Sequence, residues 1–241
     1  RRGLARGAAG RLRPASYAKR RTFVLFRVPA MIAAMAPTAS ERAAAPPAAE
    51  GAGRRGKGER TRAAILERAV DLASVEGLEG LTIGRLAADL RMSKSGLFAH
   101  FGSKQELQVA TVQAAGRRFA RAVLEPAAAA PEGAPRLRAL AEAYLARIDL
   151  YAGGCFWGAV AAEHDDRLGA VRDAIVAAID SWLGELERQA RIAGAADPGR
   201  VAFELYAVMQ AANSRDRLGD GERALQHARA AVERLLADLE G

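Results

Sequence analysis

Hydrophobic residues recur every three or four positions from about residue 59 to the end of the chain, which is the period of an α-helix. A first helix is predicted over about Glu59 to Glu76, because Gly77 and Gly80 then interrupt the pattern. Its buried face is expected to hold Ile65, Ala69, Leu72 and Ala73. The same period continues through the second half of the chain, so the pattern predicts an all-α fold.

Residues 82 to 101 predict two short helices joined by a tight turn. Thr82 is a good N-cap, because its hydroxyl can accept a backbone proton of the first turn. The first helix then has an apolar face of Ile83, Leu86, Ala87 and Leu90. Ala87 is small at the point where the two helices of such a pair must approach closely.

The second helix of this pair is expected to begin after Ser93, which can cap it. We expect three of its residues to point inward, namely Leu97, Phe98 and Phe101. The outward face would then hold Lys94, Ser95, Gly96, Ala99 and His100. Small residues let a helix enter a DNA major groove deeply, while hydroxyl, amine and imidazole groups reach phosphates and base edges.

Further helices are predicted along the rest of the chain. Ser103 opens the Ser-x-x-Glu spacing of a capping box, so a long helix should run from there to about Leu124. Residues 126 to 135 are interpreted as a loop. The later helices are expected over 136–152, over 156–164, from Leu168 to about Ala193, from Asp197-Pro198 onward, and along a final seam of Leu225, Ala228, Val232, Leu235 and Leu239.

The stretch from Thr61 to Leu107 resembles the TetR family of transcriptional regulators. The residues that carry the resemblance include Ile65-Leu66, Ala69, Leu72, Gly77, Leu81-Thr82-Ile83, Leu86-Ala87, Met92-Ser93-Lys94, Leu97-Phe98, His100-Phe101, Ser103-Lys104 and Leu107. Two positions depart from the family pattern. Arg91 stands in the turn where the family usually has Gly, and Phe98 stands where it often has Tyr. A residue other than Gly is uncommon at positive φ, so Arg91 could alter the turn.

The resemblance implies a regulator that binds double-stranded operator DNA. Lys94 and Lys104 are expected to hold phosphates, while Ser95, Gly96 and His100 are the candidates for base edges or groove walls. Thr82 and Arg85 could touch the DNA backbone, and His100 could instead be a packed or solvated histidine. The complete set of DNA-binding candidates is Thr82, Arg85, Ser93, Lys94, Ser95, Gly96, Phe98, His100 and Lys104.

The second half of the chain gathers most of its large side chains and a few polar ones, as small-molecule sites do. The ligand-binding candidates are Tyr151, Phe156, Trp157, His164, Trp182, Tyr206, Met209 and Gln210; Tyr144, Phe203 and Asn213 belong to the same group of residues. Many of them could equally be core or dimer contacts. The resemblance implies an effector site here, its identity unknown, and a homodimer formed through the last two helices.

Composition and charge narrow the picture. Residues 1–58 carry a net charge of +11, residues 59–119 a net +2, and residues 120–241 a net −5. A mildly basic segment followed by an acidic one suits a protein that binds the phosphates of DNA with only one of its domains.

Cys155 is the only cysteine, which fits a reducing cytoplasm. No Cys/His spacing typical of zinc sites occurs, so we expect no metal and no cofactor, and no apolar run is long enough to span a membrane.

Residues 1–53 show no sustained period and are rich in Arg, Ala, Gly and Pro, so we interpret them as a disordered extension. The preferred explanation is a segment upstream of a true start at Met31 or Met35. The alternative is a twin-arginine signal at Arg20-Arg21, but Arg27 and Pro29 interrupt the apolar stretch that follows. The expected organisation is this extension, a helix-turn-helix DNA-binding domain over 54–119, and a regulatory and dimerisation domain over 120–241.

Two other functions are weighed against this interpretation. The cluster Glu163, His164, Asp165 and Asp166 could support acid–base chemistry, although adjacent charges before a helix more often cap its N-terminus. No phosphate loop, nucleophile elbow or HExxH motif is present, so an enzyme is not expected. A helical adaptor, or a DNA-binding module without regulation, is the remaining alternative.

Overall fold

The structure of the protein is a computed structural model, and it describes residues 52–240. These residues form helices and turns, without a strand among them, which confirms the predicted all-α fold. The elements in chain order are α3 (Ala52–Gly80), α4 (Ile83–Asp89), α5 (Lys94–Phe101), α6 (Lys104–Phe119), the π-helical segment η1 (Ala120–Leu124), α7 (Glu125–Ala127), α8 (Ala134–Leu145), α9 (Phe156–Glu163), α10 (Ala170–Ile192), α11 (Pro198–Arg217) and α12 (Gly221–Glu240).

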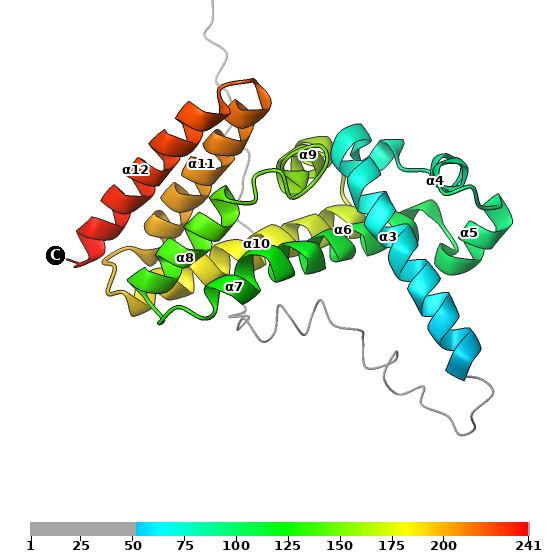
Figure 1. Cartoon of the computed structure of the whole chain (residues 1–241), viewed down its shortest axis with the longest axis horizontal. Helices are drawn as coiled ribbons and strands as arrows, with labels where there is room; N and C mark the ends of the chain where they lie inside the picture. Colours follow the sequence, from blue (N-terminus) through cyan, green and yellow to red (C-terminus); the bar gives the residue numbers. More distant parts are fainter. Residues whose placement is uncertain (1–51, 241) are drawn as a thin grey trace, which may run out of the picture.

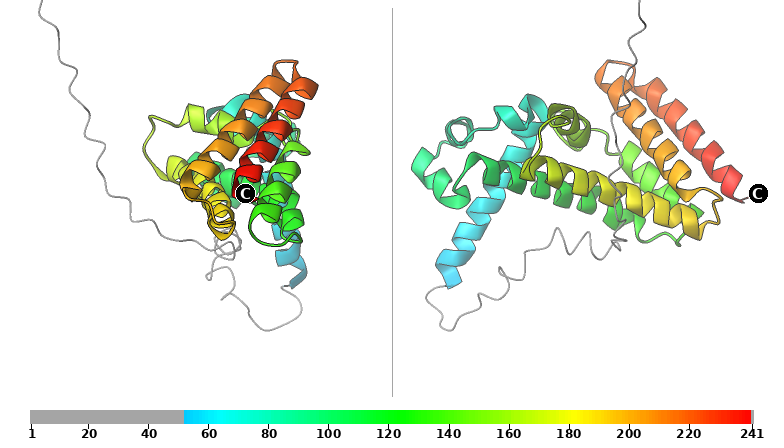
Figure 2. Two further views of the ribbon diagram at one scale, coloured as in Figure 1. Left: turned by 90° about the vertical axis from the view of Figure 1, so that its left-hand side faces the viewer. Right: turned by 180° about the vertical axis from the view of Figure 1, so that it is seen from behind.

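The helices form an elongated molecule whose two ends are connected by long helices. Helices α3, α4 and α5 lie at one end, and α8, α11 and α12 lie at the other (Figure 1). Helices α6 and α10 run side by side between these ends, as the views from the side and from behind also show (Figure 2). The short helix α9 packs against α3.

The predicted helix starts are confirmed by their capping hydrogen bonds. In each case the cap side chain accepts the amide proton three residues further on, at 3.0–3.1 Å, and the four caps are Thr82, Ser93, Ser103 and Asp197. Only half of the predicted capping box forms at α6, because the Ser103 amide donates to the Phe101 carbonyl at 2.8 Å. These caps satisfy backbone donors that a helix start leaves without intrahelical partners.

The turn between α4 and α5 closes α4 with a Schellman motif. The amide of Met92 donates to the Ala87 carbonyl at 2.9 Å, and the amide of Arg91 donates to the Ala88 carbonyl at 3.3 Å. Arg91 occupies the left-handed position of this motif, with φ 54°. Arg91 therefore departs from glycine at a positive-φ position, and the turn nevertheless keeps both hydrogen bonds of the motif.

Several predicted boundaries were wrong. The helix expected over 136–152 ends at Leu145, and α3 begins at Ala52, earlier than expected. Leu168, predicted as the first member of the α10 face, is 89% exposed. Gly169 has φ 139°, and α10 starts only after it. The three- and four-residue spacing extends to Leu168, but a spacing does not show where the backbone leaves the helix.

The segment predicted as a loop from Pro126 also begins differently. Helix α6 continues through η1, where the Glu125 amide bonds to the Ala120 carbonyl five residues earlier, and Pro126 lies inside α7. A proline ring in a regular α-helix collides with the carbonyl four residues before it, here that of Ala122. The wider π-helical turn accommodates the ring, so the helix reaches Ala127.

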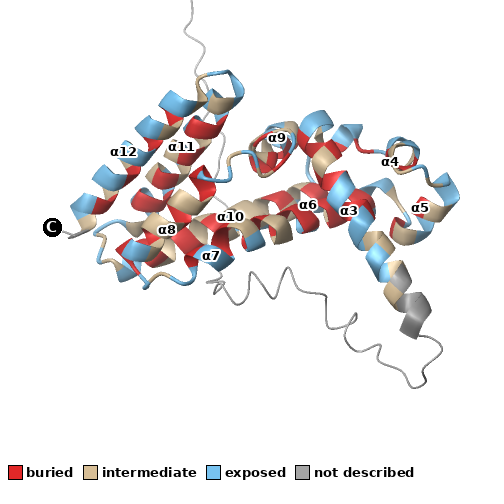
Figure 3. Cartoon of the chain, in the orientation of Figure 1, coloured by how far each residue is buried: buried red, intermediate tan, exposed pale blue. Residues whose placement is uncertain are grey.

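Two hydrophobic cores hold the molecule together. The N-terminal core joins buried residues of α3–α6 to Tyr151, the buried face of α9 and the start of α10. The C-terminal core joins the end of α6 and η1 to α8, the second half of α10, α11 and α12. Buried residues follow α6 along most of its length, whereas on α10 they lie at its start and in its second half, with none between Ile175 and Trp182 (Figure 3). Tyr151, the buried face of α9 and the first turns of α10 thus pack into the same core as the predicted DNA-binding domain.

The predicted extension at 1–53 and its signal motif fall almost entirely outside the described residues. Within residues 52–240, no helix is long and apolar enough to cross a membrane.

Candidate functional site

Helix α5 presents a polar surface at one end of the molecule. Leu97 and Phe101 are buried, as predicted, and Lys94, Ser95 and Ala99 are exposed. Phe98 was expected to point inward, but it is 51% exposed. Leu97 and Phe101 are four residues apart on one face, and the next position along the helix turns about 100° away from that face. Phe98 therefore belongs to the outer surface of α5.

The smaller candidates on this surface are placed by local contacts. Gly96 leaves room for the Ser93 cap, since a Cβ at residue 96 would stand 2.9 Å from the Ser93 hydroxyl. Ser95 lies 3.4 Å from that same hydroxyl, oxygen to oxygen. His100 is half-buried and its ring lies against Phe101, with 6.3 Å between ring centroids. Gly96 thus has a structural role beside its expected place in the groove.

The three cationic candidates differ in the hydrogen bonds and ion pairs that their side chains already make within the protein. The Lys94 ammonium lies beside Gly84, where a Cβ on residue 84 would stand 3.8 Å from it, and no ion pair involves it within residues 52–240. The Lys104 ammonium donates to the carbonyl and to the carboxylate of Glu79, both at 3.0 Å. This bond lowers the pKa of the Glu79 carboxyl. Of these two lysines, only Lys104 is held by an ion pair within residues 52–240.

Arg85 is also paired. Its guanidinium donates to Glu76 at 2.7 Å and lies 3.6 Å from Asp89. The hydrogen bond to Glu76 raises the pKa of Arg85. Both partners are partly exposed, so the pair can exchange with a phosphate at small cost.

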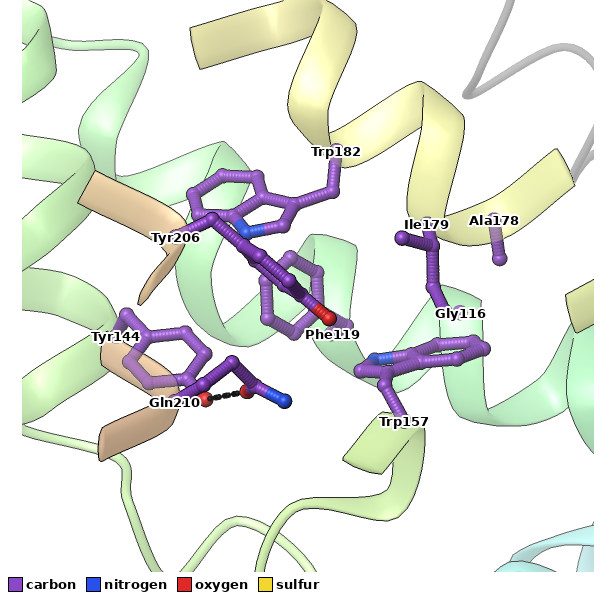
Figure 4. A pocket seen from close by; sticks show the side chains of 9 residues that line it. All are labelled: Gly116, Phe119, Tyr144, Trp157, Ala178, Ile179, Trp182, Tyr206 and Gln210. Atoms are coloured by element: carbon purple, nitrogen blue, oxygen red, sulfur yellow. Dashed lines mark hydrogen bonds between the residues drawn. The ribbon is translucent and has the colours of Figure 1, made fainter. Parts of the chain in front are cut away.

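A small cavity of about 10 Å³, enough for about one water molecule, lies where the two cores meet. Trp157 comes from the N-terminal core, whereas Phe119, Tyr144 and Trp182 come from the C-terminal core. Figure 4 shows these rings around the cavity together with the other lining residues, Gly116, Ala178, Ile179, Tyr206 and Gln210. A second hollow of about 20 Å³ adjoins the first, because Phe119, Tyr144 and Trp157 line both.

The structure brings together four of the eight predicted ligand-binding residues, namely Trp157, Trp182, Tyr206 and Gln210, on the first pocket. Tyr151 lines the second hollow. Phe156 and Met209 are fully buried in the two cores and line neither pocket. His164 is buried at the far end of α9, also away from both.

Two related expectations differ from the structure. Phe203 was grouped with the pocket aromatics but is 67% exposed on α11. Asn213 is buried within the chain, where it accepts a hydrogen bond from the Cys155 amide at 3.2 Å and lines the second hollow. The lining residues that sequence reasoning missed are Gly116, Phe119, Ala178 and Ile179. Only Phe119 offered a signal, as an aromatic residue on the predicted long helix.

Polar groups in the pocket are few and uncharged. The Tyr144 hydroxyl donates to the Gln210 side-chain oxygen at 2.9 Å, and the Cys155 thiol approaches the same oxygen at 3.3 Å. Burial raises the pKa of Tyr144 and of Tyr206, so both hydroxyls keep their protons at neutral pH. The Trp182 ring nitrogen is buried without a hydrogen-bond partner among the described residues. An unpaired buried donor costs about 1–3 kcal/mol.

Helix α9 connects this pocket with α3. Trp157 lies in its first turn, and Glu163 is its last residue. The Glu163 carboxylate accepts the backbone protons of Leu78 at 2.7 Å and of Glu79 at 2.8 Å. The Gly153 amide, just before α9, donates to the Ser74 hydroxyl at 2.9 Å. Glu163 therefore does not stand free for acid–base chemistry, because it binds the two backbone amides that follow the non-helical Gly77 and so holds the end of α3.

Two family models match the chain. Residues 65–111 match the bacterial regulatory proteins of the tetR family, and residues 133–232 match the tetracyclin repressor-like C-terminal domain. The chain belongs to the TetR family. Its α4 and α5 form the family's helix-turn-helix, so this TetR-family chain is a DNA-binding transcriptional regulator.

Solved structures share the TetR-family fold. A TetR-family transcriptional regulator from Streptomyces coelicolor is 24% identical and superposes with a TM-score of 0.68, over 77% of this chain and 97% of the other. A TetR regulator from Chloroflexus aurantiacus is 23% identical, with a TM-score of 0.69 over 75% and 96%. A regulator from Saccharomonospora viridis in complex with choline is 22% identical, with a TM-score of 0.60 over 74% and 96%. No curated protein matches the chain.

Proposed function

We propose that this TetR-family protein is a ligand-responsive repressor that acts in the cytoplasm and binds a palindromic operator as a homodimer. The observation that carries the proposal is the position of the aromatic pocket between the two cores. A ligand there touches α6, which leads to the helix-turn-helix, and α9, which holds the end of α3.

Operator contact is assigned to the outer surface of α5. Lys94 would bind phosphate, and Ser95, Gly96, Phe98 and His100 would face the major groove. Thr82, Arg85 and Ser93 would approach the DNA backbone. Lys104 stays among the candidates, but its bonds to Glu79 must be exchanged for any bond to phosphate.

Dimerisation is assigned to the outer faces of α11 and α12. Phe203 is exposed on α11, and the exposed positions that follow on the same face are small, Ala207, Ala211 and Ser214. Small residues allow two helices to pack closely around one large side chain, as a four-helix bundle between two copies would require. Two copies would place two α5 helices on successive major grooves of a palindrome.

The effector acts by binding the DNA-incompetent state more tightly. A ligand that separated Trp157 from Phe119 and Trp182 would shift α9 relative to α6. Because Glu163 of α9 binds backbone amides of α3, α3 would move with α9. The spacing of the two α5 helices then no longer matches the operator. A coupling free energy of about 1–3 kcal/mol would reduce operator affinity roughly 5- to 150-fold.

The test is binding of the 241-residue protein to a fluorescent DNA fragment from upstream of its own gene, with a shuffled fragment of equal composition as control. The proposal expects saturable, salt-sensitive binding with two protomers per site and at least about 10³-fold preference over the shuffled DNA. An Arg91→Gly variant is measured beside it, since it restores the family's residue in the turn. Sequence-blind binding by both proteins, to this fragment and to a genomic fragment library, would refute operator recognition.

A further inference from the structure

The pocket between the two cores contains hydrogen-bond donors that the protein does not use. Trp182 is only 5% exposed, and its ring N–H has no acceptor among the described residues. Its ring is held in place by Phe119, edge to face at 5.1 Å, and by Tyr144, stacked at 6.5 Å between centroids. The indole cannot easily turn to find another partner, so the unpaired donor is a fixed property of the pocket.

Gln210 adds a second donor. Its side-chain oxygen is taken by the Tyr144 hydroxyl, which leaves the amide nitrogen on the other side. Figure 4 shows that nitrogen pointing away from Tyr144 and toward Trp157, while the Trp182 nitrogen lies on the ring edge that faces Phe119 and Tyr206. Buried polar groups are normally paired, so the buried Trp182 N–H beside an apolar cavity indicates a ligand with an acceptor atom, and the partly exposed Gln210 amide offers a further donor.

The absence of charge in the lining restricts the ligand further. All nine residues that line the pocket are aromatic, aliphatic, glycine or glutamine. A carboxylate or an ammonium group placed there would lose its hydration without a counter-charge. A quaternary ammonium could contact ring faces, but it has no acceptor for the Trp182 N–H, and the donor hydrogens of Trp182 and Gln210 would repel it.

We propose that the effector is a neutral, planar aromatic carbonyl compound whose oxygen accepts the Trp182 N–H while its ring enters between Trp157 and Phe119 and widens the small cavity there. This inference rests on the proposed function in one respect, namely that the bound ligand regulates DNA binding. The chemistry of the ligand is inferred from the pocket alone.

The experiment compares four probes on the free protein: 2-acetylnaphthalene, 2-ethylnaphthalene, 2-naphthoate and choline. The chain has two tryptophans, and both line the pocket, so intrinsic fluorescence reports occupancy. Because one buried hydrogen bond changes affinity by about tenfold, 2-acetylnaphthalene should bind about ten times more tightly than 2-ethylnaphthalene, which has the same ring system and no acceptor. The two charged probes should bind at least about ten times more weakly than 2-acetylnaphthalene.

Two matched variants locate the donor. Trp182→Phe should reduce the acetyl-over-ethyl preference to about twofold or less, whereas Trp157→Phe should keep it near tenfold. Loss of ring volume affects both naphthalenes alike, so the ratio isolates the hydrogen bond, and each variant keeps one tryptophan for the readout. Equal binding of the two naphthalenes, tighter binding of 2-naphthoate or choline, or no binding of any probe would overturn the proposal.

The same probes separate this inference from the proposed function. If 2-acetylnaphthalene binds with the expected preference but leaves operator affinity unchanged, the ligand chemistry stands and ligand-responsive repression by this pocket does not. If a charged compound releases the operator while the neutral probes fail to bind, the regulatory function stands and the ligand class proposed here is wrong.

Discussion

The carboxylate of Glu163 lies against residue 77, at the position where a larger residue would place its side chain. A Cβ built on Gly77 would be 2.7 Å from Oε1 of Glu163 and 2.9 Å from Oε2. Gly77 has φ 78° and ψ 166°, a conformation that is nearly exclusive to glycine. The glycine lets the carboxylate reach the backbone amides of Leu78 and Glu79. This contact connects α9 with the end of α3.

Glu163→Gln should lower the free energy of unfolding by about 1–2 kcal/mol, because a charged acceptor of two backbone protons is replaced by a neutral amide. Urea denaturation measures the change. Glu187→Gln is the matched control, since Glu187 makes an exposed ion pair with Arg191 four residues away and should change stability by less than about 0.5 kcal/mol. Equal changes in the free energy of unfolding for the two substitutions would show that the hydrogen bonds of Glu163 do not stabilise the fold.

Gly77→Ala should destabilise the protein by about 2–4 kcal/mol, through backbone strain and the clash with Glu163 together. Gly194→Ala separates the two terms, because Gly194 has φ 84° but nothing lies within 4 Å of its Cβ position. That control should cost about 1–2 kcal/mol. Combining Gly77→Ala with Glu163→Ala should remove the clash but leave the strain. Thermal and urea unfolding that gave the two glycine variants equal losses would contradict the close approach.

Arg91→Gly should stabilise the helix-turn-helix by about 0.5–1 kcal/mol, since Arg91 is held at φ 54°. Hydrogen exchange of the α4 and α5 amides measures this locally. Arg91→Ala keeps the strain and loses only the side chain, so it serves as the comparison. A slower exchange in the alanine variant than in the glycine variant would mean that the turn is unstrained.

Lys94→Ala should weaken binding to all DNA sequences and flatten the salt dependence of log K by about 0.9 per protomer, because one phosphate contact is lost. Lys104→Ala should change the slope less, since its ammonium already binds Glu79. Fluorescence anisotropy across a salt series gives both slopes. An unchanged slope for Lys94→Ala would remove Lys94 from the phosphate contacts.

Stability should fall above pH 10 because of Tyr151. Its hydroxyl donates to the Ala115 carbonyl at 2.9 Å, and burial raises its pKa above the usual value of 10, although Arg118 beside the ring acts in the opposite direction. The folded state thus keeps a proton that the unfolded state loses. This contribution is complete below pH 10 and declines at about 1.4 kcal/mol per pH unit above it.

Urea unfolding between about pH 9 and pH 11 measures this slope. Tyr151→Phe should reduce it by about that amount, and the half-buried Tyr206 should give a smaller change when replaced by Phe. Identical slopes for wild type and Tyr151→Phe would rule out Tyr151 as a contributor to the slope.

The sequence by itself determined the helices and the helix-turn-helix. Caps such as Thr82 and Ser93 act on amides three residues away, and a helix face repeats every three to four residues, so both are visible in a local stretch of chain. The strained position of Arg91 was visible for the same reason. The direction of Phe98 was not, because Phe98 stands at the edge of the face formed by Leu97 and Phe101, and how far that face is covered depends on the other helices.

Only the tertiary structure decided the pocket and the path from it to α3. Phe119, Trp157 and Trp182 lie on three helices and meet because two cores pack together, while Phe203 and Met209, equally apolar, are placed elsewhere. Glu163 reaches Leu78 across 85 positions of sequence. Such contacts depend on how whole helices dock, which is set by the sum of many side-chain contacts and leaves no periodic signal in the chain.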